Sequence, residues 1–135
     1  MQSNDLLVIR SNGSVSLVGR SAVVNSPEEG LAYAGYLVRL RSFPEYVYSR
    51  YLNFVLNTDS VRKQIERPIR TTSGVKNINS SEISNLTIPF PPLAEQHRIV
   101  AKIDRLMEFC DRLEESIEAT KIKQTDLLNA VMSRV

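Results

Sequence analysis

The sequence predicts an α+β fold: a small mixed domain with short β-strands and two or three helices, followed by one long C-terminal helix. Three observations predict it. Short β-branched runs separated by turn residues fill roughly the first forty positions, which favours β-strands. From Pro44 onward apolar residues recur at helical spacing, and after Pro92 no proline or glycine interrupts the chain as far as Val135. We therefore expect a globular domain over residues 1–92 and a helix over residues 93–135.

The expected strands come first along the chain. Residues 5–10 ("DLLVIR") are β-branched and apolar, and the turn sequence "SNGS" separates them from a second strand through "VSLVG" and "SAVV" (residues 15–24). Gly19 is expected to mark a bend or bulge there. Alternation in residues 31–40 predicts one or two more strands. The segment "LTIPF" (residues 86–90) is expected to form the last strand, at a sheet edge because it contains a proline.

The expected helices of the globular part follow from a change of period. Pro44 suits the first position of a helix, where its missing N–H costs nothing. Four apolar residues then share one helical face and are expected in the core rather than stacked on bases: Val47, Tyr51, Phe54 and Val55. Thr58 or Asp59 is expected to cap a second helix that ends before Pro68, because a residue preceding proline avoids helical geometry. The stretch "SSEISNL" is typical of a short capped helical turn.

Charge is distributed unevenly along the chain. Residues 1–92 carry ten Lys or Arg against seven Asp or Glu, whereas residues 93–135 carry seven against eight. Near the middle of the chain a group of cations faces only Glu66: Arg62, Lys63, Arg67, Arg70 and Lys76. Clustered cations suit contact with nucleic-acid phosphates, although a solvated basic surface has the same composition. Both interpretations stay open here, because the net charge of +2 is too small to decide between them.

A polar, hydroxyl-rich loop is expected over residues 68–82 ("PIRTTSGVKNINSSE"), with Gly74 as its hinge. It is either a mobile surface loop or a loop whose side chains meet phosphates and base edges, since arginine and asparagine pair bidentately with guanine and adenine. On the second interpretation the DNA-facing candidates are polar or basic residues of this loop, of its approach and of the first turn: Arg10, Asn12, Ser14, Arg67, Arg70, Thr71, Thr72, Ser73 and Lys76.

The C-terminal helix carries a narrow apolar seam whose members alternate at steps of four and three residues, the spacing of a left-handed coiled coil. The helix-pairing candidates are Ile99, Ile103, Leu106, Cys110, Leu113, Ile117, Leu127 and Val131. Thr120 and Gln124 make two successive seam positions polar, which weakens pairing but fixes its register. A helix roughly 60 Å long with such a stripe would not persist alone in water. We expect an intermolecular partner rather than a helix folded back on its own domain.

The residues give little support for catalytic or metal chemistry. The single cysteine, Cys110, allows neither a disulfide within the chain nor a cysteine-rich metal site, and is expected to be a small buried hydrophobe. His97 has no neighbouring serine or cysteine to activate, and no phosphate-binding glycine motif occurs. We expect no cofactor, no metal and no enzymatic activity. No apolar run approaches the ~18 residues that span a bilayer, so a cytoplasmic location is expected.

Four stretches of the sequence resemble a known family, the DNA-specificity (S) subunits of type I restriction-modification systems. The first is "NDLLVIRSNGSVSLVGRSAVV" (residues 4–24), and the second joins "YLVRLR" (36–41) with "YLNFVLNTDSVRKQI" (51–65). The third, "NINSSEISNLTIPFPPLAEQHRIV" (77–100), contains the hallmark "PPLAEQ.RIV" of the segment that closes a recognition domain. The fourth, "KIDRLMEFCDRLE" (102–114), is similar to the start of the family's spacer helix.

The resemblance implies a target-recognition domain, an α+β unit that reads one half of a bipartite DNA site, followed by a spacer helix. In this family two such helices pair antiparallel, and their length sets the gap between the half-sites. The implied partners are double-stranded DNA, a modification (methyltransferase) subunit and, through it, the restriction subunit. The long helix would pair with another S chain or with a second copy of this one. The S subunit itself performs no chemistry.

Three departures accompany the resemblance. A full S subunit has two recognition domains, whereas this chain has one at most, and the family's opening portion before residues 5–10 is expected to be missing. Asn4 stands where the family has glycine. A second hypothesis is therefore a coiled-coil adaptor or a residual S-subunit fragment, which would bind partner subunits without specific DNA recognition.

Overall fold

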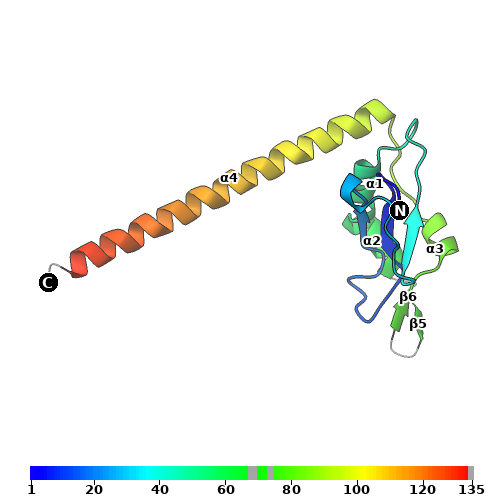
Figure 1. Ribbon diagram of the computed structural model, residues 1–135, viewed down its shortest axis with the longest axis horizontal. Helices are drawn as coiled ribbons and strands as arrows, with labels where there is room; N and C mark the ends of the chain where they lie inside the picture. The colour runs from blue at the N-terminus through cyan, green and yellow to red at the C-terminus, as the bar shows by residue number, and fades with distance from the viewer. Residues whose placement is uncertain (67–69, 73–74, 134–135) are drawn as a thin grey trace. The chain divides into compact units, whose positions relative to one another are not determined.

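The computed structural model describes residues 1–66, 70–72 and 75–133, and the chain divides into two compact units, Met1–His97 and Arg98–Val135 (Figure 1). The strands are β1 (Leu6–Ile9), β2 (Ser11–Asn12), β3 (Ser21–Val23), β4 (Leu37–Leu40), β5 (Arg70–Thr72) and β6 (Val75–Asn77). The helices are a 3-10 turn η1 (Ser26–Glu28), α1 (Ser49–Leu56), α2 (Asp59–Glu66), α3 (Ser80–Ser84) and α4 (Leu93–Met132). The predicted α+β fold with a long C-terminal helix is confirmed.

The first sheet has the strand order β3-β1-β4, with both outer strands antiparallel to β1. Side chains of β1 alternate between its two faces. Leu6 and Val8 are buried in the core, whereas Leu7 and Ile9 are half-buried on the opposite face. The strand predicted in residues 5–10 is therefore confirmed, and its inward face supplies the centre of the core.

Asn4 opens β1 in a backbone conformation that few residues other than glycine adopt. Its φ is 67°, in the left-handed region that glycine adopts freely and asparagine tolerates better than most residues. The Asn4 N–H donates to the Val24 carbonyl at 2.9 Å, and the Asn4 carbonyl accepts the Ser49 hydroxyl at 2.7 Å. Asparagine therefore suits this position, and its backbone bonds tie the start of β1 to Val24 and α1.

The strand predicted over residues 15–24 is confirmed only in its second half, which forms β3 (Ser21–Val23), and the strand predicted over residues 86–90 is wrong. Residues 15–19 form turns, because the Gly19 N–H donates back to the Ile9 carbonyl at 2.7 Å and closes the segment into a compact loop. Residues 86–90 are not a strand either. There the side chain of Gln64 replaces a partner strand: it donates to the Thr87 carbonyl and accepts the Thr87 N–H, each at 2.9 Å.

The second sheet has the strand order β2-β6-β5, again antiparallel. Its strands β5 and β6 lie inside residues 68–82, so the loop predicted there is wrong over the described residues. The hairpin that they form extends from one end of the first unit (Figure 1). Their threonine and valine residues favour an extended backbone once a partner strand is present, and β2 is that partner. The hinge expected at Gly74 lies outside the described residues.

Helices α1 and α2 complete the core. The helix predicted from Pro44 begins only at Ser49, because residues 43–47 form a turn in which the Val47 N–H donates to the Phe43 carbonyl at 2.9 Å. Tyr51 and Val55 are buried, as expected for core residues, and Phe54 is half-buried. The buried Tyr51 hydroxyl donates to the Pro89 carbonyl at 3.0 Å, and burial raises the pKa of Tyr51.

The remaining helix predictions are confirmed. α2 begins at Asp59, and the Thr58 carbonyl accepts its first helical bond from the Arg62 N–H at 2.8 Å. α3 begins with a capping box in which Asn79 and Glu82 exchange hydrogen bonds, each 2.8 Å long. α4 runs for 40 residues, and its first turn belongs to the first unit.

Candidate nucleic-acid interface

The second sheet joins the two groups of DNA-facing candidates, which lie about sixty positions apart in the sequence. Asn12 of β2 lies opposite Lys76 of β6, and Lys76 in turn lies opposite Thr71 of β5. Ser11 and Asn77 form the neighbouring pair in the register between β2 and β6. Directly opposed residues of an antiparallel pair have neighbouring positions on one face of the sheet. Asn12 and Lys76 therefore share a face, although no local pattern in the sequence indicates that their segments meet.

Arg10 marks the point where the chain crosses from the first sheet to the second. Its N–H donates to the Tyr36 carbonyl, and its carbonyl accepts the Ile78 N–H, each at 2.9 Å. Both bonds involve the main chain, and the residue itself is exposed. The backbone is thus fixed on both sides, and an arginine is held at the surface beside β2.

Asn12 and Ser14 form a tight polar turn after β2. The Ser14 N–H donates to Oδ1 of Asn12 at 2.9 Å, the pattern of an Asx turn. The Ser14 and Ser16 hydroxyls lie 2.8 Å apart in a further hydrogen bond. Ser14 is exposed and Asn12 is half-buried. The turn presents hydroxyl and amide groups, which can act as hydrogen-bond donors or acceptors toward phosphates and base edges.

The other DNA-facing candidates are placed less completely. Arg70, Thr71 and Thr72 occupy successive positions of β5, and the structure describes their backbone only. Arg67 and Ser73 lie outside the described residues. Lys76 is half-buried in β6, and it has an interaction partner within the chain.

Arg62 does not belong with the surface cations among which the sequence grouped it. Only 5% of it is exposed, because its guanidinium lies against backbone carbonyls of the turn after β2. The sequence does hold a signal for this burial. Arg62 follows Val61, and Ile65 comes one turn later; both are buried, so α2 turns this side toward the core.

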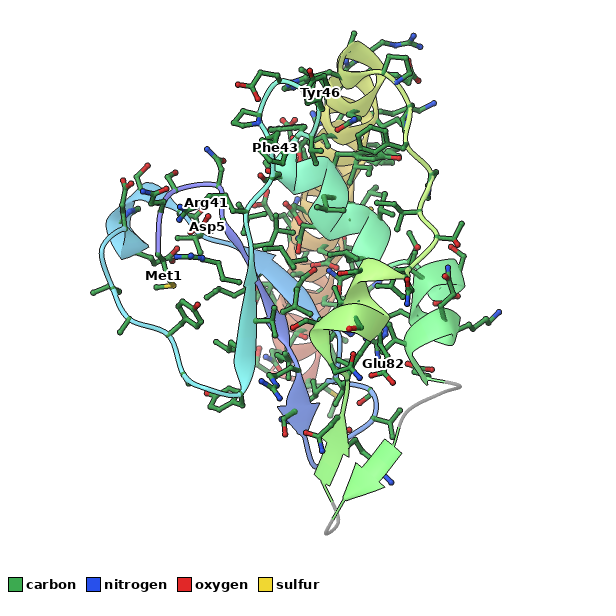
Figure 2. All side chains as sticks on the ribbon, turned by 90° about the vertical axis from the view of Figure 1, so that its right-hand side faces the viewer. Met1, Asp5, Arg41, Phe43, Tyr46 and Glu82 are labelled. Atoms are coloured by element: carbon green, nitrogen blue, oxygen red, sulfur yellow. The ribbon has the colours of Figure 1, made fainter. Side chains whose placement is uncertain are left out.

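A second buried charge lies at the start of β1. The Asp5 carboxylate accepts from Nε and Nη2 of Arg41 at 2.8 and 2.9 Å, and from the Gln2 N–H at 2.8 Å (Figure 2). The Arg41 hydrogen bond is the main reason that the pKa of Asp5 falls from 3.8 to about 2; burial opposes it, and Gln2 and Arg39 add to the lowering. This pair ties β1 to the residue that follows β4, so Arg41 serves the fold.

The second unit carries the helix-pairing candidates. Ile99 and Ile103 are half-buried, whereas Leu106, Leu113, Ile117, Leu127 and Val131 are all exposed. Cys110, expected to be a small buried hydrophobe, is exposed in the single chain. Apolar residues next to the seam, such as Met107 and Leu128, are exposed as well and widen the stripe. The seam has the composition of an interface, and pairing through it stays a prediction.

Other kinds of site receive no support from the described residues. Within residues 1–66, 70–72 and 75–133, no group of three or more His, Cys, Asp or Glu could hold a metal ion. In the same residues, no helix has both the length and the apolar character needed to cross a membrane.

Comparison with known proteins gives a consistent result. The chain is 28% identical over 134 residues to the type I restriction enzyme StySPI specificity subunit of Salmonella potsdam, a match covering 99% of this chain and 29% of that protein. It is 27% identical over 139 residues to the EcoKI specificity subunit of Escherichia coli K12, again covering 99% and 29%. The EcoAI specificity subunit of Escherichia coli is 33% identical over 75 residues, covering 56% of this chain and 13% of that protein.

The chain spans less than a third of the length of these curated relatives. The model of one protein family, the type I restriction modification DNA specificity domain, matches residues 28–124. These residues include α1, the second sheet apart from β2, and most of α4. The chain therefore belongs to the type I restriction modification DNA specificity domain family.

Proposed function

We propose that residues 1–92 form a recognition module that reads one half of a bipartite site in double-stranded DNA through the second sheet. The pairing of Asn12 with Lys76 carries this proposal, because it unites two polar and basic segments on one face. The B-DNA major groove is about 12 Å wide and admits a two-stranded β-ribbon. The hairpin of β5 and β6 is such a ribbon, and β2 with its polar turn lies beside it.

The chemistry of the candidate side chains indicates which of them would contact phosphates and which would contact bases. Arginine and lysine side chains would contact phosphates, which supply affinity and fix the register of the protein on the duplex. The amide of Asn12 and the hydroxyls of the turn and of β5 would meet base edges and supply specificity. Membership of the DNA specificity domain family supports this assignment over a pure adaptor.

The long helix has a separate proposed role. We propose that α4 pairs with the helix of another S chain or of a second copy, and that its length sets the distance between two half-sites. A modification subunit would dock on this scaffold and recruit the restriction subunit, in keeping with the similarity of the chain to specificity subunits of type I restriction enzymes. In this role the chain performs no catalysis and works in the cytoplasm, where the DNA of the cell is found.

The test is a selection from a pool of random duplexes by the full chain, followed by binding titrations. We expect one short sequence to be enriched. Asn12→Ala should relax the preference at one base pair, at a cost of about 1–3 kcal/mol in discrimination. Lys76→Ala should weaken binding to every sequence alike and lower the salt slope by about one. Lys123→Ala, which removes the same charge from α4, is the matched control. Failure of the parent chain to enrich any sequence would overturn the proposal.

A further inference from the structure

The guanidinium of Arg62 links α2 to the turn that follows β2, and we call this set of contacts the clamp. Nη1 donates to the Val18 carbonyl at 2.5 Å, and Nη2 donates to the Val15 and Ser16 carbonyls at 3.2 Å each. Nη2 also donates to Oε1 of Glu66 at 2.8 Å. A single side chain from another element thus binds three backbone carbonyls of one short turn, of which the Ser16 carbonyl also accepts from Nε of Arg20 at 3.2 Å.

Arginine is suited to this position because its planar fork offers five donors in fixed directions. The turn closes only part of its own hydrogen bonding, and a carbonyl left without a partner in a dry interior costs about 1–3 kcal/mol. Glu66, the acidic partner, is 41% exposed on its side chain, so the charge of the clamp stays partly solvated. The clamp therefore fixes the backbone of the turn. Arg62 differs in this from a surface arginine, whose guanidinium is free to contact a phosphate.

Gly19 leaves the space that the Arg62 guanidinium and the Ile65 side chain occupy. Its φ of 80° lies in the left-handed region, and a Cβ there would lie 2.6 Å from Cδ1 of Ile65 and 3.1 Å from Nη1 of Arg62. Val18, beside it, is fully buried. A side chain at position 19 would therefore displace either the core residue or the clamp.

The clamp connects the two segments that carry the proposed DNA-facing residues. On one side lies the turn with Ser14 and Ser16, directly after β2 and Asn12. On the other side lies α2, which ends at Glu66, four positions before β5 begins. Base readout requires side chains held to within about 0.5 Å of their working positions, and a flexible turn would not meet that requirement.

We propose that Arg62 is a positioning residue for base readout: it holds the turn after β2 in place beside the β5–β6 hairpin and does not itself contact DNA. The inference rests on the proposed function. It separates Arg62 from neighbouring Lys63, which is exposed on the same helix and contributes positive charge at the surface.

The decisive variant is Arg62→Lys, which keeps the charge and loses the fork, since one ammonium cannot span the three carbonyls. The probes are the duplex enriched by the parent chain and an unrelated duplex of equal length. We expect affinity for the enriched duplex to fall on the order of tenfold, with affinity for the unrelated duplex and the salt slope unchanged. Glu66→Ala removes one clamp contact at a partly exposed position, so it should fold and lose discrimination by a smaller factor.

Two controls separate positioning from other effects. Lys63→Ala should weaken binding to both duplexes equally, because it removes only charge. Val55→Ala truncates a buried residue of α1 and reports the effect of lowered stability alone; it should keep the discrimination ratio of the parent at a temperature where it remains folded.

Each outcome bears on a distinct claim. If the parent chain enriches no sequence, the proposed function fails and the positioning role with it. If the parent discriminates and the folded Arg62→Lys and Glu66→Ala variants discriminate equally well, only the positioning role is overturned. Equal loss of discrimination in Val55→Ala would also overturn it, since the effect would then follow stability in general.

Discussion

Oε1 of Gln96 accepts the backbone N–H of Tyr48 at 2.8 Å, so a residue in the first turn of α4 holds the residue that precedes α1. Nε2 of Gln96 donates to the carbonyls of Tyr46 and Pro91, each at 2.9 Å, and the side chain is fully buried. The ring of Tyr48 stacks on His97 with centroids 4.1 Å apart. Figure 2 shows Tyr46 on the loop that Gln96 holds. The glutamine of the "PPLAEQ" hallmark therefore builds the start of α4 into the first unit.

Gln96→Leu should lower the free energy of unfolding by about 1–3 kcal/mol, because the partly buried Tyr48 N–H and two carbonyls would lose their hydrogen-bond partner. Urea denaturation followed by circular dichroism measures the change. Lys102→Ala, at an exposed position further along α4, is the control and should stay within about 0.5 kcal/mol of the parent. A Gln96→Leu variant as stable as the parent would show that these bonds contribute nothing net.

The stability of the fold should depend on pH through Asp5. The Arg41 hydrogen bond holds the pKa of Asp5 at about 2 in the folded chain, below the ordinary value of 3.8. The unfolded chain then binds the proton more readily, so the contribution of Asp5 is complete above pH 4 or so and is lost as pH falls through about 2. Denaturant titrations across this window measure it.

Asp5→Asn should be less stable than the parent at neutral pH and should lack this part of the acid dependence, since asparagine cannot ionise. Asp126→Asn, at an exposed position of α4, is the matched control and should retain it. An Asp5→Asn profile parallel to that of the parent from pH 4 down to about 2 would assign the acid sensitivity to other carboxyls.

Assembly through the seam is tested by one isoleucine on it and one beside it. Ile117 lies on the heptad pattern and Ile122 lies off it, and each is 55% exposed in the single chain. Ile117→Asp should weaken association by about 3 kcal/mol or more, because an unpaired charge would be buried between helices. Ile122→Asp should leave association nearly unchanged. Sedimentation equilibrium measures the association of both variants. Equal effects of the two substitutions would show that the contact surface is not the predicted seam.

The basic residues of the hairpin region should control the salt dependence of DNA binding. Replacing Arg67, Arg70 and Lys76 together by alanine should lower the salt slope by about three, if each contacts one phosphate. Replacing Lys102, Lys121 and Lys123 on α4 removes the same net charge and should leave the slope unchanged. Fluorescence anisotropy titrations at several salt concentrations measure the slope. A parental slope in the first triple variant would remove these residues from the proposed interface.

Local pattern predicted some elements well. β1 was evident from its β-branched run, α3 from its capping sequence, and α4 from an uninterrupted period without proline or glycine. Each of these signals lies within a few residues of the element that it forms, because helix bonds and caps join near neighbours. The turn at residues 15–19 was mistaken for a strand for the converse reason. Its conformation depends on Arg62, which is more than forty positions away.

By itself, then, the sequence determined the α+β class, the long helix with its seam, and the family resemblance carried by residues 77–114. Only the tertiary structure decided that β2 pairs with β6, that residues 70–72 and 75–77 form strands, and that Arg62 is buried while Arg10 is exposed. The physical reason is that strand pairing and the burial of a charge depend on partners distant in the chain. A basic residue has the same letter whether its guanidinium meets water, phosphate or a backbone carbonyl.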